Sequence, residues 1–172
     1  MIKLVKLSSE YKRHLFDMME EWTASGEKII PYSIRRLDYQ DFEDYLKGFY
    51  EDESITGDDK VPSTTYWGYD TERDIFVGAV NIRHRLNEQL LKNGGHIGDG
   101  VRPSERRKGY ATQMIESALK ICREMGISSV LMVCDSRNTA SRKSILNNGG
   151  IMENEILADG ILEQRFWIDI KK

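Results

Sequence analysis

The sequence predicts one domain of the α/β (α+β) class, built on a mixed and mostly antiparallel sheet. Residues 63–86 hold two β-rich runs separated by "DTERD", which is typical of an antiparallel hairpin. Residues 96–135 alternate strand, helix and strand, the order of a right-handed crossover between parallel strands. The runs 151–157 and 165–170 predict a second hairpin at the end of the chain.

Length and composition place the chain among ordinary globular proteins. Its 172 residues suit one domain over 1–172, and 40% of them are apolar and 31% charged. The net charge of −3 argues against nucleic acid as a partner, because such proteins carry a basic total or a long basic face. We find no signal peptide and no run near the roughly 20 apolar residues of a membrane span. We therefore expect a cytoplasmic protein with no membrane partner.

The N-terminal third begins with a strand and a helix. Residues 2–7, "IKLVKL", predict the strand. Apolar residues then recur at i, i+3, i+4 and i+7 from Leu15 to Trp22, which is the spacing of one helical face. Residues 29–34 form a connector broken by a proline.

A second helix carries an aromatic stripe between Phe42 and Tyr50. This stripe is expected in the core, and the other interpretation is the wall of a substrate pocket. Residues 51–63 are acidic and rich in turn formers, so we expect a loop that is long enough to act as a lid or specificity loop.

After the first hairpin the pattern continues through the rest of the domain. Residues 87–95 predict a short helical or turn insert, and 96–102 a short strand. Residues 106–125 predict the clearest helix, with apolar residues stepping by three or four. The near-continuous apolar run 128–135 is typical of a strand buried on both faces, so it is expected as the parallel neighbour of strand 96–102. Residues 138–150 predict a further short helix.

A basic turn precedes the clearest helix, in the stretch "RPSERRKGYAT". A helix start presents unpaired backbone N–H groups and a partial positive charge, which together bind phosphates. Gly109 would leave room for a phosphate to approach the backbone. The stretch lacks the P-loop and the dinucleotide patterns. The other interpretation is a solvated basic turn. Its basic residues are Arg102, Arg106, Arg107 and Lys108.

The stretch "GVRPSERRKGYATQMIESAL" resembles the acetyl-CoA signature of the GNAT N-acetyltransferase superfamily, V-x-P-x-x-[QR]-[RK]-x-G-[YI]-[GA]. The stretch "VCDSRNTASRKSILNNGG" is similar to the later asparagine-centred helix and loop of that superfamily. The order of the predicted elements is also the GNAT order, so the resemblance covers nearly the whole chain. It is strongest with a bacterial subgroup that carries "NIRH", "GGHIG" and "SERRKGYA". The resemblance implies helices on both faces of the sheet.

The resemblance also implies acetyl-CoA as co-substrate, with no metal. The backbone around Val101 would pair with the pantetheine arm like an added strand, and the backbone N–H groups that follow Arg106 would hold the pyrophosphate. Asn138 matches the asparagine that contacts the cofactor arm, and the next helical turn could reach the phosphate end. The cofactor-binding residues so implied are Val101, Arg102, Arg106, Arg107, Lys108, Gly109, Tyr110, Ala111, Thr112, Asn138, Ser141 and Arg142.

One position departs from the GNAT pattern. GNAT enzymes often carry a tyrosine seven residues after that asparagine, where it protonates the leaving thiolate, and this chain has Ile145 there. Either a different acid or water must then protonate the thiolate, or the thiolate leaves without an acid. The departure keeps open the alternative of a non-catalytic acyl-CoA-binding or regulatory module.

Acetyl transfer to an amine needs a base, because an amine with a pKa of about 8–10 is mostly protonated at neutral pH. His96 opens the strand that should line the cleft, Asp99 lies in its middle, and His84 ends the preceding strand. His96 is favoured, since histidine titrates near neutral pH without perturbation. Asp99 could instead bind a cationic substrate, and each of these residues also has a purely structural interpretation. His14 is expected on the surface and Cys134 in the core.

We therefore predict an enzyme that moves an acetyl group from acetyl-CoA to a primary amine by direct transfer. The acceptor could be a small molecule or a protein amine, and a homodimer is left open.

Overall fold

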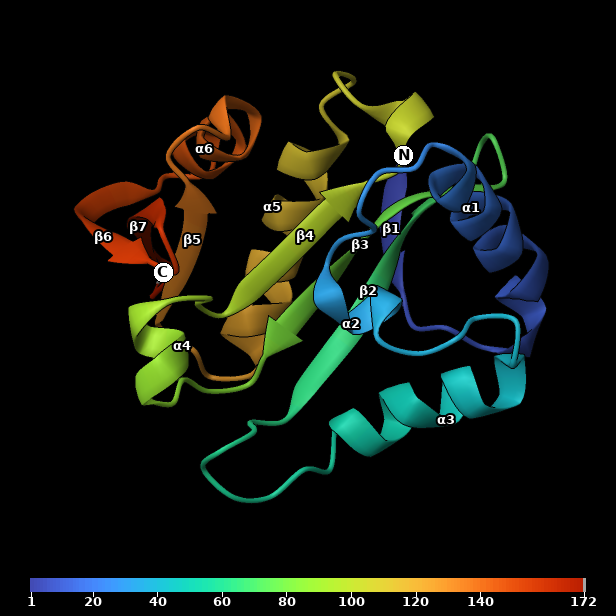
Figure 1. The fold of residues 1–172 in the computed structure, drawn as a ribbon, viewed down its shortest axis with the longest axis horizontal. Coiled ribbons are helices and arrows are strands. Elements are labelled where there is room, and N and C mark those ends of the chain that lie inside the picture. The colour runs from blue at the N-terminus through green and yellow to red at the C-terminus, as the bar shows by residue number, and fades with distance from the viewer. Residues whose placement is uncertain (172) are drawn as a thin grey trace.

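Two antiparallel sheets organise the computed structural model, which describes residues 1–171 (Figure 1). The first sheet has the order β1-β2-β3-β4, with β1 at Ile2–Val5, β2 at Ser63–Asp70, β3 at Ile75–Arg83 and β4 at Ile97–Val101. The second has the order β5-β7-β6, with β5 at Ser129–Asp135, β6 at Ile151–Ala158 and β7 at Ile161–Asp169. Both predicted hairpins, β2–β3 and β6–β7, are present.

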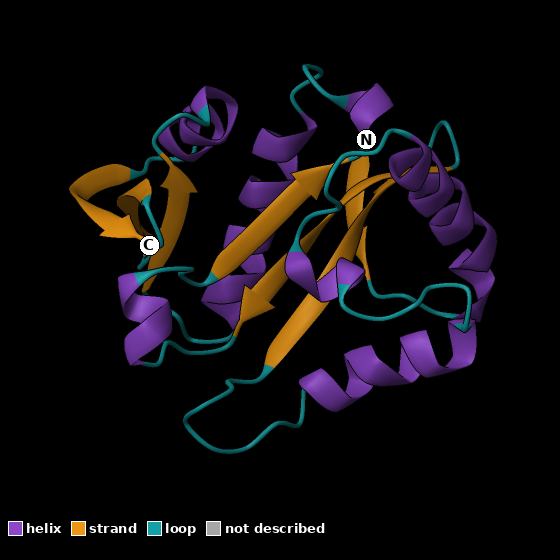
Figure 2. Cartoon of the chain, viewed as in Figure 1, coloured by secondary structure: helices purple, strands orange, loops and turns teal. Residues whose placement is uncertain are grey.

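The helices lie on both sides of the sheets (Figure 2). They are α1 (Lys12–Ala24), α2 (Tyr32–Arg35), α3 (Phe42–Asp52), α4 (Glu88–Lys92), α5 (Tyr110–Glu124) and α6 (Thr139–Asn147). Short α2 occupies the segment that the sequence predicts as a connector. No helix within residues 1–171 is both long and apolar enough to cross a bilayer.

The two faces of the first sheet carry separate cores. Helix α5 packs on one face, where its stripe from Met114 to Cys122 meets β3, β4, β5 and β7. Helices α1 and α3 pack on the other face, where Trp22 and Tyr45 join Trp67 of β2. The aromatic stripe of α3 is thus core, as its spacing predicts, although Tyr50 is exposed.

Strands β4 and β5 are not hydrogen-bonded as a parallel pair, so that detail of the predicted fold is not confirmed. Within residues 1–171 they are joined by one bridge, between Gly95 and Met132, and by contacts of His96 with Leu131. Beyond this point the two strands diverge and leave a V-shaped opening (Figure 1). Within residues 1–171 no strand pairs with the β4 edge on that side, although the Val101 carbonyl accepts a hydrogen bond from the Arg106 side chain.

Helix α5 begins at Tyr110, four residues later than the sequence pattern predicts. A 3₁₀ turn covers Pro103–Glu105, and two left-handed residues follow, Arg107 with φ 63° and Gly109 with φ 82°. Left-handed conformations interrupt an α-helix. The basic residues consequently lie in an irregular loop before the helix, which we call the phosphate loop (102–109).

The expected acidic loop is present and spans 53–62 between α3 and β2. The segment after β3 holds it in place: the Asn87 side chain donates to the Asp58 carbonyl at 2.9 Å, and Arg85 donates to the Gly57 carbonyl.

Candidate active site

A cleft of about 800 Å³ opens where β4 and β5 diverge. Three elements line it: the end of β4, the phosphate loop with the first turn of α5, and one face of α6. Ile30, from the segment before α2, closes one side. The lining residues that the sequence also singles out are Asp99, Val101, Arg106, Arg107, Gly109, Tyr110, Ala111, Thr112, Asn138 and Ser141.

Backbone N–H groups gather at the mouth of this cleft. The N–H groups from Arg107 to Thr112 have no hydrogen-bond partner within residues 1–171, and the first one of this turn to be paired is Gln113 N–H, which donates to the Gly109 carbonyl at 3.2 Å. A residue with a side chain at Gly109 would be strained at φ 82°, although no atom crowds that position. This arrangement fits an anionic pyrophosphate.

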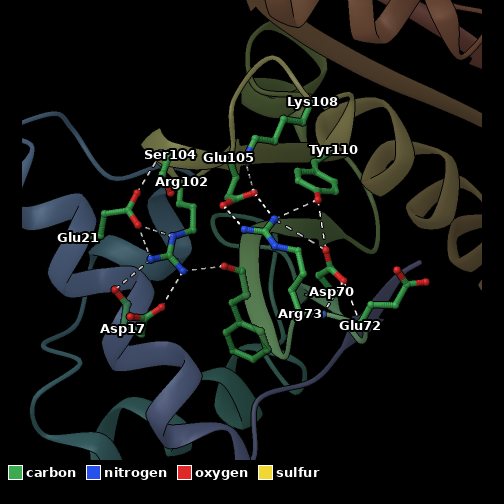
Figure 3. Close-up of polar contacts among 11 residues, drawn as sticks. Asp17, Glu21, Asp70, Glu72, Arg73, Arg102, Ser104, Glu105, Lys108 and Tyr110 are labelled. Carbon is green, nitrogen blue, oxygen red and sulfur yellow. Dashed lines mark hydrogen bonds and ion pairs between the residues drawn. The ribbon is translucent and has the colours of Figure 1, made fainter.

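A buried ion pair holds Glu105, a residue of the phosphate loop that also lines the cleft (Figure 3). Glu105 is only 4% exposed, and Arg73 from the β2–β3 turn donates to both of its carboxylate oxygens, at 2.6 and 2.8 Å. Lys108 donates to the same carboxylate at 3.1 Å. The hydrogen bonds from Arg73 and then Lys108 lower the pKa of Glu105 to about 2.

A second contact from the same turn reaches the first residue of α5 (Figure 3). The Tyr110 hydroxyl donates to Asp70 at 3.2 Å, and Asp70 also accepts the backbone N–H groups of Glu72 and Arg73. The hydroxyl of Tyr110 is therefore used within the protein, while its backbone N–H remains free.

Two of the basic residues implied for the cofactor turn away from the cleft. Arg102 is buried, donates to Asp17 at 2.9 Å and to Glu21 at 2.8 Å, and ties the loop to α1. Lys108 is engaged with Glu105. Neither lines the cleft, because each forms an ion pair with a carboxylate of another part of the fold or of the loop itself.

The other two basic residues do line the cleft. Arg106 pairs with Glu27 at 2.5 Å and donates to the Val101 carbonyl at 3.2 Å. Arg107 is exposed and has no ion pair within residues 1–171, so its guanidinium remains available to an anion.

Helix α6 forms the opposite wall. Asn138 caps it by accepting the Ser141 N–H at 3.0 Å. Arg142 is not among the lining residues. Besides Ile30, Gly100 and Glu105, the sequence analysis missed four lining residues on α6: Ala140, Lys143, Ser144 and Asn147. Their i, i+3, i+4 and i+7 spacing marks one helical face, which is the signal that could have identified them.

The three candidate bases lie in different surroundings. Asp99 lines the cleft, and burial raises its pKa to about 6. The Nδ1 atom of His96 accepts the Leu131 N–H at 2.9 Å, and burial together with the charge of Arg83 lowers the pKa of His96 to about 4. His84 lies beyond the cleft and is bonded to Thr64 at 2.8 Å.

The remaining expectations concern the core. Ile145 is fully buried, so this position presents no polar group to the cleft. Both cysteines are buried and free, and burial raises the pKa of the Cys134 thiol. His14 is buried and bonded to Asp74 at 2.6 Å, not exposed as expected, because its ring packs among aromatic side chains. Within residues 1–171 no cluster of potential metal ligands occurs.

Comparisons with solved structures give the same architecture. MccE, the microcin C7 self-immunity acetyltransferase, solved with acetyl-CoA and AMP, is 17% identical with a TM-score of 0.69 over 98% of this chain and 92% of its own. RimL, the ribosomal L7/L12 alpha-N-protein acetyltransferase, solved with coenzyme A, is 13% identical with a TM-score of 0.71 over 99% and 94%. The spermidine/spermine N-acetyltransferase SpeG from Vibrio cholerae is 13% identical with a TM-score of 0.62 over 98% and 95%.

At these identities the likeness establishes the fold and leaves the acceptor open. No curated protein sequence matches significantly. The model of the acetyltransferase (GNAT) domain matches residues 2–151, most of the chain. The chain therefore belongs to the GNAT acetyltransferase family.

Proposed function

We propose that the protein transfers the acetyl group of acetyl-CoA directly to a primary amine. The observation that carries this proposal is the row of free backbone N–H groups from Arg107 to Thr112, at the mouth of a cleft that ends at Asp99. The N–H groups and Arg107 would hold the pyrophosphate. The free edge of β4 would pair with the pantetheine arm and aim the thioester inward.

Asp99 serves as the base in this proposal. A carboxylate with a pKa of about 6 is ionised at neutral pH and remains basic enough to take a proton from an ammonium group at measurable rates. Asp99 takes one proton from the ammonium group. The neutral amine nitrogen then attacks the thioester carbonyl carbon, the C–S bond breaks as the tetrahedral intermediate collapses, and the second proton of the nitrogen passes to the leaving thiolate. The base assignment thus moves from His96, whose Nδ1 lone pair is already used, to Asp99.

The leaving thiolate of coenzyme A needs little assistance, because thiols ionise near pH 8.5. Ser141 lines the cleft beside Asn138, and its hydroxyl is our candidate to relay the proton, accepting it from the reacting nitrogen while donating its own to the thiolate. Ser144 also lines the cleft, but its hydroxyl donates to the Ala140 carbonyl at 3.1 Å. Ser141 thus takes the place of the tyrosine for which this chain has Ile145.

The test is a screen of primary amines for acetyl-CoA-dependent release of free thiol, with acetylated product identified by mass. Turnover with any amine supports the enzyme. Acetyl-CoA binding without turnover across peptides, amino acids, polyamines and aminoglycosides would instead support the non-catalytic acyl-CoA-binding module.

A further inference from the structure

The open edge of β4 presents backbone groups to the cleft, and one of them is already occupied. The Arg102 N–H donates to the Val77 carbonyl of β3 at 2.9 Å. Hydrogen bonds alternate from one side of an antiparallel strand to the other, so the carbonyls of Val101 and Asp99 point away from β3, toward the open side. The Val101 carbonyl accepts a hydrogen bond there from Nε of Arg106, at 3.2 Å. A side chain of this protein therefore fills a position at which a ligand would pair with the edge.

Two further contacts hold the Arg106 side chain in this place. Its Nη1 atom pairs with the carboxylate of Glu27 at 2.5 Å, and its guanidinium carbon lies 5.9 Å from the centre of the Trp22 ring. Glu27 belongs to the segment between α1 and α2, so these contacts join the phosphate loop to another part of the fold. We call this arrangement, in which Arg106 is bound to Glu27 and Val101, the Arg106 latch.

The latch is weak enough to open. The side chains of Arg106 and Glu27 are 39% and 50% exposed, and an ion pair of this exposure is equivalent to no more than about 5-fold in an equilibrium constant. Arg106 lines the cleft together with the free N–H groups from Arg107 to Thr112. A pyrophosphate bound at those groups would offer the guanidinium more negative charge than the single carboxylate of Glu27, so Arg106 can exchange one partner for the other.

We propose that Glu27 is a positioning residue, which holds Arg106 on the Val101 carbonyl until acetyl-CoA offers the guanidinium a phosphate in exchange. This inference rests on the proposed binding of acetyl-CoA. The pantetheine arm displaces Arg106 from the β4 edge, and the pyrophosphate of the same molecule binds the released side chain. A thioester without phosphates must open the latch with no such compensation, so its apparent affinity is reduced in proportion to the fraction of molecules in which the latch is open. The latch thus makes the site selective for phosphate-bearing thioesters.

The first measurement compares acetyl-CoA with S-acetylpantetheine, which keeps the arm and the thioester but has no phosphate. Arg106→Ala should lower the Kd of S-acetylpantetheine by about 2- to 10-fold, because the Val101 carbonyl is released. The same variant should raise the Kd of acetyl-CoA by about 3- to 30-fold, because a charged donor to the phosphate is lost. Ligand-detected NMR measures the weak ligand, and titration calorimetry measures the strong one.

Arg107→Ala is the matched control, because Arg107 also lines the cleft but its side chain has no hydrogen bond or ion pair within residues 1–171. It should weaken acetyl-CoA and leave the Kd of S-acetylpantetheine unchanged. If Arg106→Ala also left S-acetylpantetheine unchanged, or weakened it, Arg106 would not be a latch. A wild-type protein that binds neither ligand would count against the proposed function itself, and against this inference with it.

The second measurement tests whether Glu27 acts through Arg106. Glu27→Gln should lower the Kd of acetyl-CoA by about 2- to 5-fold in the wild-type background and should have no effect in the Arg106→Ala background. An effect of equal size in both backgrounds would show that Glu27 acts on the ligand by its charge alone. No effect in either would show that the ion pair does not oppose binding. Both results would overturn the proposal.

Glu116→Gln is the control for the loss of one negative charge. Glu116 pairs with Lys120 at 3.3 Å on the exposed surface of α5, so its substitution should leave the Kd of acetyl-CoA near wild type. Should Arg106→Ala not fold, Glu27→Gln alone decides, since an unchanged or higher Kd in that variant would contradict the latch.

Discussion

Asp99 and His96 lie three residues apart, yet their surroundings give them different chemistry. Burial disfavours the charged form of each, so it makes Asp99 a stronger base and His96 a weaker one. The backbone N–H of Leu131 also occupies Nδ1 of His96, which leaves the proton of the neutral ring on Nε2. His96 thus closes the junction of β4 and β5, and Asp99 remains free in the cleft.

Asp99→Asn keeps the shape of the side chain and removes its basicity. We expect kcat to fall by at least about 100-fold, as for loss of a general base, with the Kd of acetyl-CoA nearly unchanged. His96→Asn is the control, because its amide oxygen can still accept the Leu131 N–H, and it should retain kcat within several-fold. If His96→Asn lost activity while Asp99→Asn retained it, His96 would be the base.

The pH profile of wild-type kcat/KM tests the same residue by another route. Protonation of Asp99 below its pKa of about 6 removes the base, so kcat/KM should rise with pH through about 6. An inflection that persists unchanged in residual Asp99→Asn activity would show that another group titrates.

The contribution of Asp99 to the free energy of unfolding should fall as pH rises, whereas kcat/KM rises. The folded-state pKa of Asp99 is raised, so the folded protein binds this proton more tightly than the unfolded chain, and the resulting stability is lost as pH rises from about 4 to about 6. Asp99→Asn should therefore melt a few degrees above wild type at pH 7.5 and show little difference near pH 4. A thermal-unfolding series in pH measures this, and equal melting temperatures at pH 7.5 would contradict it.

Ser141→Ala and Ser144→Ala form a matched pair on one wall of the cleft. If the Ser141 hydroxyl protonates the thiolate, its loss should lower kcat by about 10-fold or more, whereas the loss of Ser144 should have little effect. Equal kcat values for the two variants would indicate that water, and not Ser141, delivers the proton to the thiolate.

Single-residue roles were the least predictable part from sequence. The resemblance to GNAT enzymes pointed to Asn138 and Arg107, which both line the cleft, but it could not show that two carboxylates of α1 bind Arg102. Those partners lie more than 80 residues away in the chain, so only the folded structure brings them together.

At the level of elements, the β2–β3 turn supports the phosphate loop. Arg73 of this turn binds Glu105, which precedes the free N–H groups, and Asp70 at its start binds Tyr110, whose own N–H is one of them. The geometry of the anion site therefore depends on a hairpin that does not touch the cleft.

Arg73→Gln should raise the Kd of acetyl-CoA by roughly 3- to 30-fold, because it leaves the buried Glu105 carboxylate short of partners and loosens the loop. Titration calorimetry measures this. Arg13→Gln is the control, since Arg13 lies on α1 and binds Asp74 of the same turn at 2.7 Å, not Glu105. An unchanged Kd in Arg73→Gln would contradict the role of the hairpin.

Element types followed well from hydrophobic periodicity, as for α1, α5 and both hairpins. The start of α5 did not, because the left-handed conformation of Arg107 is set by its loop and not by a residue preference. The sequence also could not predict that β4 diverges from β5, since a run of apolar residues specifies the burial of a strand and not its partner.

At the scale of the whole molecule, the two sheets meet at one narrow junction and the proposed ligand would lie between them. The phosphate loop and β4 belong to one side of the cleft, and α6 to the other. A ligand that contacts both sides binds only the folded state and must stabilise it.

Acetyl-CoA at about 100 times its Kd should add roughly 2.7 kcal/mol to the free energy of unfolding. For a domain of this size that is about 5–10 °C in Tm, measurable by differential scanning fluorimetry. Gly109→Asp is the control: its φ of 82° is tolerated better by aspartate than by most residues and no atom lies closer than 4.0 Å, so the fold should persist. Its carboxylate would lie where the pyrophosphate must approach, so the shift should vanish. A wild-type protein that does not respond to millimolar acetyl-CoA, or a Gly109→Asp variant that responds as fully as wild type, would show that this loop is not the anion site.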